Sequence, residues 1–293
     1  MEYWLWLSAI KGLGPKSCQR LLDALGEPST IYQADYPTLT AIEGIGDRTA
    51  RALLEARSLD EAQRLLEDCQ KKGIQILTCQ DPLYHPGLQR LDNPPLLLYV
   101  KGRLRPDRPS VALVGSRRCS DYGRKICLMT ADYLARQGIT VVSGMAQGID
   151  GYAHSACLKA KGYTLAFLGS GLDHVYPAQH RALMEAIADS GALLTEYPPS
   201  ICPHPAFFPQ RNRLISAWSD KILLVEAGEK SGALITARLA KDLGKEVYVL
   251  PNEISRSSGR GANQLILEGA RIFLDPSQLL FEDLEIKKER PST

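Results

Sequence analysis

From residue 111 onward, short apolar runs alternate with longer segments that have helical periodicity. The apolar runs are VALVGS (111–116), ITVVSG (139–144), TLAFLGS (164–170), ALLTEY (192–197), KILLVEA (221–227) and EVYVLP (246–251). Continuous apolar strands that alternate with helices are typical of a parallel sheet covered on both faces. The pattern therefore predicts an α/β fold with a mostly parallel, doubly wound sheet. Ligands of such sheets bind where the carboxyl ends of the strands meet.

The first 70 residues have a different, helical pattern that contains an internal repeat. IKGLGPKSCQRLLDALG (10–26) and IEGIGDRTARALLEARS (42–58) both place Gly-x-Gly before an amphipathic helix. Glycines permit the tight turn of a helix-hairpin-helix motif, and the helix that follows exposes backbone N–H groups that can hold a phosphate. We therefore expect a small all-α helix-hairpin-helix domain over 1–70. Its net charge of −4 favours a structural or docking role over a grip on DNA.

The chain after this repeat predicts one larger domain and a tail. Two strand-like runs, ILTC and LLLYV, flank a proline-rich segment within 71–110. They lead into the regular pattern, so the sheet domain is expected to span 71–275. Residues 276–293 are predicted to be a C-terminal tail, too short for a further domain, and the final EIKKERPST has the composition of a disordered segment.

Charge is distributed unevenly along the chain. The net charge is only +2, yet residues 71–274 alone carry +8. Within 101–125 the cations are Lys101, Arg103, Arg105, Arg108, Arg117, Arg118, Arg124 and Lys125, and the acids are Asp107 and Asp121. This stretch would meet a polyanion if the protein binds one; the alternative is a solvated basic face.

Small and basic residues gather at the predicted strand ends. The candidates for anion binding there are Gly115, Ser116, Arg117, Arg118, Gly144, Gly169, Ser231 and Gly232. Small residues let a ligand approach the backbone, and the helices that follow offer N–H donors. The first strand end, GSRRCSDYG, lacks the spacing G-x-G-x-x-G of a dinucleotide site, and no P-loop motif occurs. Arginines in place of glycines favour phosphates held from the side by guanidinium groups.

The segment FFPQRNR (207–213) also fits an extended anion. Aromatic faces can stack on unpaired bases, while Arg211 and Arg213 hold the backbone and Asn212 reads a base edge or fixes the loop. The alternative is that the phenylalanines belong to the core and that the arginines pair with Asp150 or Glu196. The sequence leaves both interpretations open.

Signs of catalysis and of bound metal are weak. Asp150 and His154 share a helix face but are more typical of a helix cap and a buried polar network, and no G-x-S-x-G motif is present. Glu226, at the end of a strand, is the best candidate for cleavage of a nucleotide's N-glycosidic bond. The seven cysteines show no C-x-x-C spacing, so neither a zinc site nor a disulfide framework is expected. The apolar N-terminus is too short to span a membrane and lacks a signal peptide's basic start, which favours a cytoplasmic protein.

A series of ordered motifs resembles one known family. These motifs are VGSRRCSDYG, VVSGMAQGIDGYAH, GSGLDHVYP, TEYPP, FPQRNRLIS, VEAGEKSGALITA and GANQLILEGA, over about 105–274. Together they resemble the DNA-processing protein A (DprA/Smf) proteins of bacterial transformation. The resemblance implies an extended Rossmann-like domain after a SAM-like helical domain. It also implies a homodimer that binds and protects single-stranded DNA and helps load the RecA recombinase, with no catalysis, cofactor or metal.

By motif position, the resemblance places Arg117 in the DNA pocket. Some relatives carry a lysine where this chain has Ala178, and Arg181 is the candidate to compensate. Many relatives also end in a winged-helix domain, for which the roughly 19 residues after the sheet are too few, so either the protein lacks this domain or the sequence is part of a longer chain. The rival interpretation is a nucleoside monophosphate-hydrolysing enzyme of the lysine-decarboxylase-like group, although the Pro-Gly-Gly-x-Gly-Thr segment of that group is missing.

Overall fold

The computed structural model describes residues 1–281, which fall into two compact units. The first consists of Met1–Tyr84 with Leu91–Tyr99, and the second of His85–Arg90 with the chain from Val100 onward. The boundary predicted at residue 70 lies at the end of the last N-terminal helix. Contacts, however, assign the following strand to the first unit as well.

The first unit confirms the predicted helical repeat. Its helices are α1 (Glu2–Ala9), α2 (Pro15–Leu25), α3 (Pro28–Gln33), α4 (Tyr36–Thr40), α5 (Asp47–Glu55) and α6 (Asp60–Lys71). The glycines Gly12 and Gly44 have φ of 81° and 79°, the left-handed backbone that a tight hairpin needs. Each repeat contributes a fully buried leucine, Leu21 from α2 and Leu53 from α5.

The strands form one mostly parallel sheet. They are β1 (Gln75–Thr78), β2 (Leu97–Gly102), β3 (Ser110–Val114), β4 (Thr140–Ser143), β5 (Thr164–Phe167), β6 (Ala192–Thr195), β7 (Lys221–Leu224), β8 (Glu246–Val249) and β9 (Arg271–Ile272). Their order is β1-β2-β6-β5-β4-β3-β7-β8-β9, and the neighbours from β6 to β9 run parallel. All six strands predicted after residue 110 are confirmed, and β9 was not predicted.

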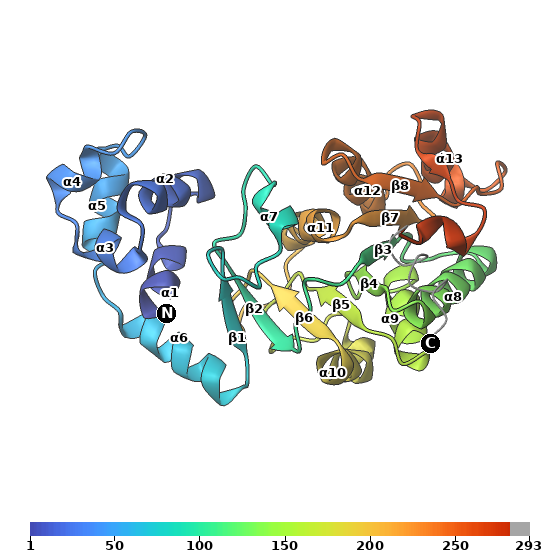
Figure 1. Cartoon of the computed structure of the whole chain (residues 1–293), viewed down its shortest axis with the longest axis horizontal. Helices are drawn as coiled ribbons and strands as arrows, with labels where there is room; N and C mark the ends of the chain where they lie inside the picture. Colours follow the sequence, from blue (N-terminus) through green and yellow to red (C-terminus); the bar gives the residue numbers. More distant parts are fainter. Residues whose placement is uncertain (282–293) are drawn as a thin grey trace, which may run out of the picture. The chain divides into compact units, whose positions relative to one another are not determined.

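Helices cover both faces of the sheet, as the doubly wound pattern predicts. Figure 1 shows α8 (Asp121–Arg136), α9 (Ile149–Lys159) and α10 (Arg181–Ser190) on one face. The other face carries α11 (Phe207–Trp218), α12 (Gly232–Asp242) and α13 (Arg260–Leu267). Because β3 has β4 on one side and β7 on the other, the chain reverses its winding direction at the end of β3. That switch point is where open α/β sheets bind ligands.

Two segments differ from the sequence prediction. The helix expected over NRLISAWS begins five residues earlier, so both phenylalanines of FFPQRNR lie in the first turn of α11. Pro209 is compatible with this turn because the first N–H groups of a helix have no intrahelical acceptor. The predicted tail begins with a 3-10 helix, Pro276–Leu279, whose Leu279 is fully buried in the core beside Phe273. The disorder predicted for the last nine residues lies outside the described residues.

No helix within residues 1–281 is both long enough and apolar enough to cross a membrane.

Candidate nucleic-acid interface

The turn after β3 presents two exposed arginines at the switch point. The Ser116 hydroxyl accepts a hydrogen bond from the Arg118 N–H at 3.3 Å and donates to the Arg118 carbonyl at 2.9 Å. The Ser116 N–H donates to the Glu226 carbonyl at 2.8 Å, which extends the pairing of β3 with β7. Ser116 therefore shapes the turn, and the side chains of Arg117 and Arg118 are left exposed.

Arg117 lies on an aromatic surface at the mouth of a cavity. Its guanidinium carbon is 5.5 Å from the centre of the Phe208 ring, and the Tyr176 ring packs against the same phenylalanine at 5.1 Å. The adjoining cavity has a volume of about 440 Å³. It is lined by Val114, Gly115, Arg117, Ala146, Asp150, Tyr176, Pro205, Phe208, Pro209, Arg211, Asn212, Ile215, Ser231, Gly232, Ala233, Ile235 and Thr236.

The start of α12 supplies the polar wall of this cavity. The Ser231 hydroxyl caps the helix by accepting from the Ala233 N–H at 3.3 Å. Ser231, Gly232 and Ala233 all line the cavity, so the positive end of the helix dipole lies beside it. The cavity thus combines aromatic and aliphatic side chains with the Arg117 guanidinium and the positive end of a helix dipole.

Three candidate glycines make room for protein side chains. A Cβ atom on Gly115 would lie 2.7 Å from Ile149 Cγ1, and one on Gly169 would lie 2.9 Å from the Phe208 ring. A Cβ atom on Gly144 would overlap the Arg211 guanidinium. The side-chain direction is therefore filled at all three strand ends; Gly144 and Gly169 are buried, whereas the half-buried Gly115 still lines the cavity. Their glycines position Ile149, Phe208 and Arg211 instead.

Arg211 is a buried support of the cavity wall. Only 4% of it is exposed, and its Nη1 donates to the carbonyls of Gly144 and, at 2.5 Å, Phe167. Burial lowers the pKa of Arg211 to about 10, while the nearby Asp150 opposes the shift. Burial likewise raises the pKa of Asp150. Arg211 therefore joins the ends of β4 and β5 to α11.

The neighbouring residues of the Arg-Asn-Arg segment are also engaged within the protein. Asn212 accepts from Arg211 Nε at 3.0 Å and donates to the Gly232 carbonyl at 3.4 Å. Arg213 forms an ion pair with Glu196, whose pKa is raised because it is buried. Of the two interpretations that the sequence left open, the structure supports the loop-locking one for Arg211 and Arg213. Asn212 faces the cavity.

Arg181 lies apart from the cavity described above. It begins α10 and is exposed, but it lines neither that cavity nor a second one of about 570 Å³. The second cavity is lined by Arg117, Arg118, Cys119, Gln147, Gly148, Gly151, Tyr152, Ser155, Gln179, His180, Ala182 and Leu183. Arg117 borders both cavities, whereas a compensating role for Arg181 stays a prediction.

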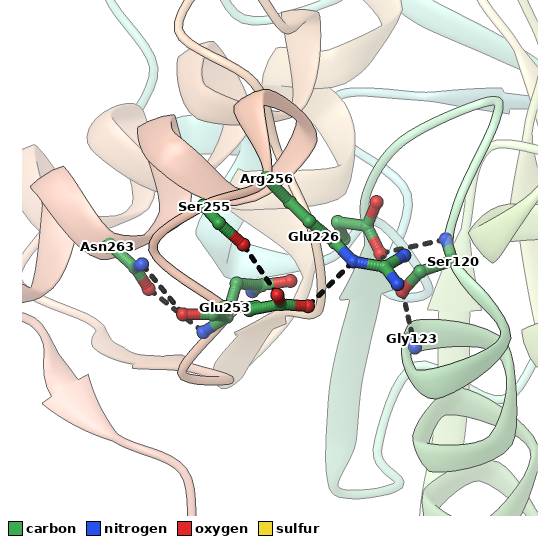
Figure 2. Close-up of polar contacts among 8 residues, drawn as sticks. Ser120, Gly123, Glu226, Glu253, Ser255, Arg256 and Asn263 are labelled. Atoms are coloured by element: carbon green, nitrogen blue, oxygen red, sulfur yellow. Dashed lines mark hydrogen bonds and ion pairs between the residues drawn. The ribbon is translucent and has the colours of Figure 1, made fainter.

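Glu226, the candidate for glycosidic cleavage, is used inside the protein. Figure 2 shows its carboxylate against the start of α8, where Oε2 accepts from the Ser120 N–H at 2.9 Å and from the Ser120 hydroxyl at 2.6 Å. Only 1% of the residue is exposed, and it does not line the cavity that contains Arg117. The Ser120 hydroxyl in turn accepts from the Gly123 N–H. This carboxylate is the anion that occupies the N-terminus of α8.

The basic run 101–125 divides between opposite edges of the sheet. Arg117, Arg118, Arg124 and Lys125 follow β3 and lie at the carboxyl edge. Arg103, by contrast, donates its N–H to the carbonyl of Gly191, just before β6. Arg108 donates to the carbonyl of Gly138, just before β4. The stretch 101–125 is therefore not one continuous surface, because β3 separates its two halves.

Several cavity residues were not among the predicted site residues. Tyr176, Ile215 and Ile235 supply much of its apolar lining. Tyr176 belongs to the motif GSGLDHVYP, so the motif could have indicated it as a site residue. The two isoleucines lie in helical segments, where the sequence does not distinguish them from ordinary helix residues.

With the site defined, comparison with known proteins identifies the family. The sequence profile of DNA recombination-mediator protein A matches residues 75–284. This chain belongs to that family. The profile of a SAM-like helix-hairpin-helix tandem also matches, over residues 7–58 and 36–71.

Two relatives of the family align with nearly the whole chain. Protein Smf of a Synechocystis species is 39% identical over 283 residues, which cover 95% of this chain and 71% of that protein. Protein Smf of Escherichia coli is 34% identical over 283 residues, or 95% of this chain and 74% of its own length.

Two solved structures of the family share the fold. The X-ray structure of DNA processing protein A from Streptococcus pneumoniae has a TM-score of 0.83 at 28% identity, and the match covers 96% of this chain and 98% of that one. A structure of the Helicobacter pylori protein, which concerns its single-stranded DNA binding mode, has a TM-score of 0.64 at 30% identity. It covers 73% of this chain and 96% of that one. These similarities confirm the resemblance drawn from the motifs.

Proposed function

We propose that this chain binds single-stranded DNA at the carboxyl edge of its sheet. The observation that carries the proposal is the exposed Arg117 guanidinium, held 5.5 Å above Phe208 at the mouth of the 440 Å³ cavity. A guanidinium suits a phosphate, and the aromatic surface beside it suits an unstacked base. The single-stranded DNA binding described for the Helicobacter pylori relative supports the same assignment.

The cavity divides the work between base and backbone. Tyr176 is 42% exposed and Ile235 is 53% exposed, so both offer apolar surface to a base. Arg117 and Arg118 would hold the phosphates, with the positive end of the α12 dipole favouring the negative charge. A base inside a duplex cannot enter such a cavity, because its faces are already stacked and its edge is paired.

The proposal includes binding without hydrolysis. Glu226 is supported in a structural role by its two bonds to Ser120, which leave it buried beneath the turn. Incubation with nucleoside monophosphates should release no free base, as measured by chromatography. Steady turnover that is lost in Glu226→Gln would overturn this part of the proposal.

Family membership supports the wider role, in which a cytoplasmic homodimer protects single strands and helps load RecA.

A patch on the second unit offers a surface for a second copy. Ile254 is 86% exposed and Leu267 is 83% exposed, and both line one shallow cavity. Ile272 and Leu274 follow at 45% and 79% exposed. Ile254 and Leu267 share one cavity, and exposed apolar side chains that lie together are typical of a protein interface. Faster RecA nucleation on protected strands in the presence of the chain would support the wider role.

The experiment for DNA binding compares single- and double-stranded oligonucleotides of one sequence across a salt series. Single strands should bind more tightly at every salt concentration. The logarithm of their association constant should fall linearly with the logarithm of the salt concentration, and the size of this salt slope should be about 0.7 for each phosphate contacted. Equal affinity for both forms would contradict a cavity that takes unpaired bases.

A further inference from the structure

A second group of cations lies at the amino edge of the sheet, away from the proposed DNA cavity. It consists of Lys101, Arg103, Arg105 and Arg108, and we refer to it as the amino-edge surface. Lys101 and Arg103 are exposed where β2 ends beside the start of β6, since the Arg103 N–H donates to the Gly191 carbonyl at 2.9 Å. The surface therefore begins on the opposite side of the strands from Arg117.

Tyr163 holds two of these arginines in place. The guanidinium carbons of Arg105 and Arg108 lie 5.5 and 5.6 Å from the centre of its ring. The Tyr163 hydroxyl donates to the Arg103 carbonyl at 2.9 Å, and Arg108 Nη2 donates to the Gly138 carbonyl at 2.9 Å. The ring itself is only 6% exposed, immediately before β5. Two positive charges are thus fixed against one buried aromatic ring.

No ion pair with a carboxylate neutralises the amino-edge surface within residues 1–281. Other exposed arginines of the same unit do have such partners, as Arg124 has in Asp121 and Arg136 in Asp132. The one acid within the surface's own segment is Asp107. Like charges held close together cost free energy unless an anion approaches them. The arrangement suits a ligand that supplies several negative charges in a row.

We propose that the amino-edge surface binds a second segment of nucleic-acid backbone. Guanidinium groups stacked on an aromatic ring keep their N–H edges available for phosphate oxygens. Four cations in one segment match an extended polyanion better than a single phosphate. The five residues of β3 separate the two edges by roughly 16 Å, so one strand must be long enough to leave the cavity and continue around the sheet.

This inference rests on the proposed function for the identity of the polyanion, because a strand held at Arg117 supplies the neighbouring phosphates. An acidic polypeptide is the competing ligand, and the test includes it.

The test uses two double variants of the full chain and two lengths of single strand. Arg105→Gln with Arg108→Gln removes the pair over Tyr163, and Lys101→Gln with Arg103→Gln removes the two exposed cations. Between residues 1 and 281, the side chains of Lys101 and Arg103 form no ion pair. The control is Arg64→Gln with Lys71→Gln, which removes two charges from exposed positions of α6. Binding is measured by fluorescence anisotropy across salt with strands of about 6 and about 40 nucleotides, since a single-strand groove such as that of an OB fold holds roughly 4 to 16 nucleotides.

For the long strand, each double variant should lose roughly 5- to 30-fold in affinity, and its salt slope should fall by roughly 1.4. Binding of the short strand should stay at the wild-type value, as should both measurements for the control. A long-strand affinity and slope equal to wild type in both double variants would overturn the inference. The inference would also be overturned if polyglutamate displaced the long strand from the amino-edge surface more effectively than competing DNA did. Failure of the wild type to bind the short strand would instead count against the cavity, and the long-strand comparison would still decide the amino edge.

Discussion

At the residue scale, the arginines near the cavity have opposite roles. Arg117 is exposed over an aromatic ring, whereas Arg211 is buried and bonded to two carbonyls. The motifs containing them look equally suited to phosphate, so the sequence could not separate them. The difference arises because α11 begins at Phe207, which turns Arg211 inward beneath the strand ends.

Arg211→Gln is expected to lower the free energy of unfolding by about 3 kcal/mol, because the carbonyls of Gly144 and Phe167 lose a charged donor in a buried place. Urea denaturation measures this change. Arg118→Gln is the control, since its exposed side chain should change stability by less than about 0.5 kcal/mol. Equal stability of the two variants would show that Arg211 does not support the wall.

His154 gives a prediction on pH. Burial first, then Arg211 and His180, lower the pKa of His154 to about 3 from 6.5. A lowered pKa stabilises the fold above the unfolded value of 6.5, and this contribution is lost as the pH falls towards 3. From pH of about 6.5 to about 4.5, the wild type should therefore lose about 1.4 kcal/mol per pH unit more than His154→Gln.

Denaturation curves at a series of pH values measure that difference. His85, whose pKa burial lowers to about 4, is present in both proteins and cancels from the difference. Parallel curves for the two proteins would mean that His154 takes up a proton without opening the core.

At the element scale, the positions of the strands could be predicted from the sequence. Which side chains pack at the ends of those strands could not. Apolar runs located six strands because a sheet covered on both faces requires them. The start of α11 was missed because Phe-Phe-Pro reads as a loop, although a proline fits the first helical turn. β9 was missed because it has only two residues, both exposed. The glycines at the strand ends marked the site, but which side chain fills the space above each one depends on the tertiary fold.

Gly169→Ala tests the link between a strand end and α11. The new Cβ would lie 2.9 Å from the Phe208 ring and displace it, together with the support of Arg117. We expect a loss of about 1–3 kcal/mol in stability and weaker single-strand binding. Combining this change with Phe208→Leu should cost less than the sum of the two single changes, because the smaller side chain removes the clash. Strict additivity in unfolding experiments would rule out this contact as the cause.

At the scale of the whole molecule, the sequence gives the number of charged and apolar residues but not their positions on the folded surface. The basic run looked like one surface, yet β3 carries its halves to opposite edges. The exposure of Leu267 and Leu274 could not be predicted either, because the apolar residues close to them in the chain, Leu265 and Phe273, are buried. Placement of both features depends on strand order and on which helix face remains uncovered.

The patch near α13 predicts a self-association that charge would disrupt. Leu267→Asp with Leu274→Asp should convert a homodimer to a monomer, since two charges would be buried in the interface. Analytical ultracentrifugation measures the mass, and Leu128→Asp on the exposed face of α8 is the control. A wild-type chain that sediments as a monomer at micromolar concentration, or a variant that remains a dimer, would place the interface elsewhere or exclude it.

The most direct test of the DNA site is the affinity of Arg117→Ala for a short single-stranded oligonucleotide, with Arg64→Ala as the matched loss of one exposed charge. Arg117→Ala should weaken binding roughly 10- to 100-fold, as expected for a charged hydrogen bond to phosphate, and should lower the salt slope by about 0.7. Arg64→Ala should bind with wild-type affinity. Wild-type affinity in Arg117→Ala, with the protein folded, would contradict the assignment of the cavity beside Phe208 as the DNA site.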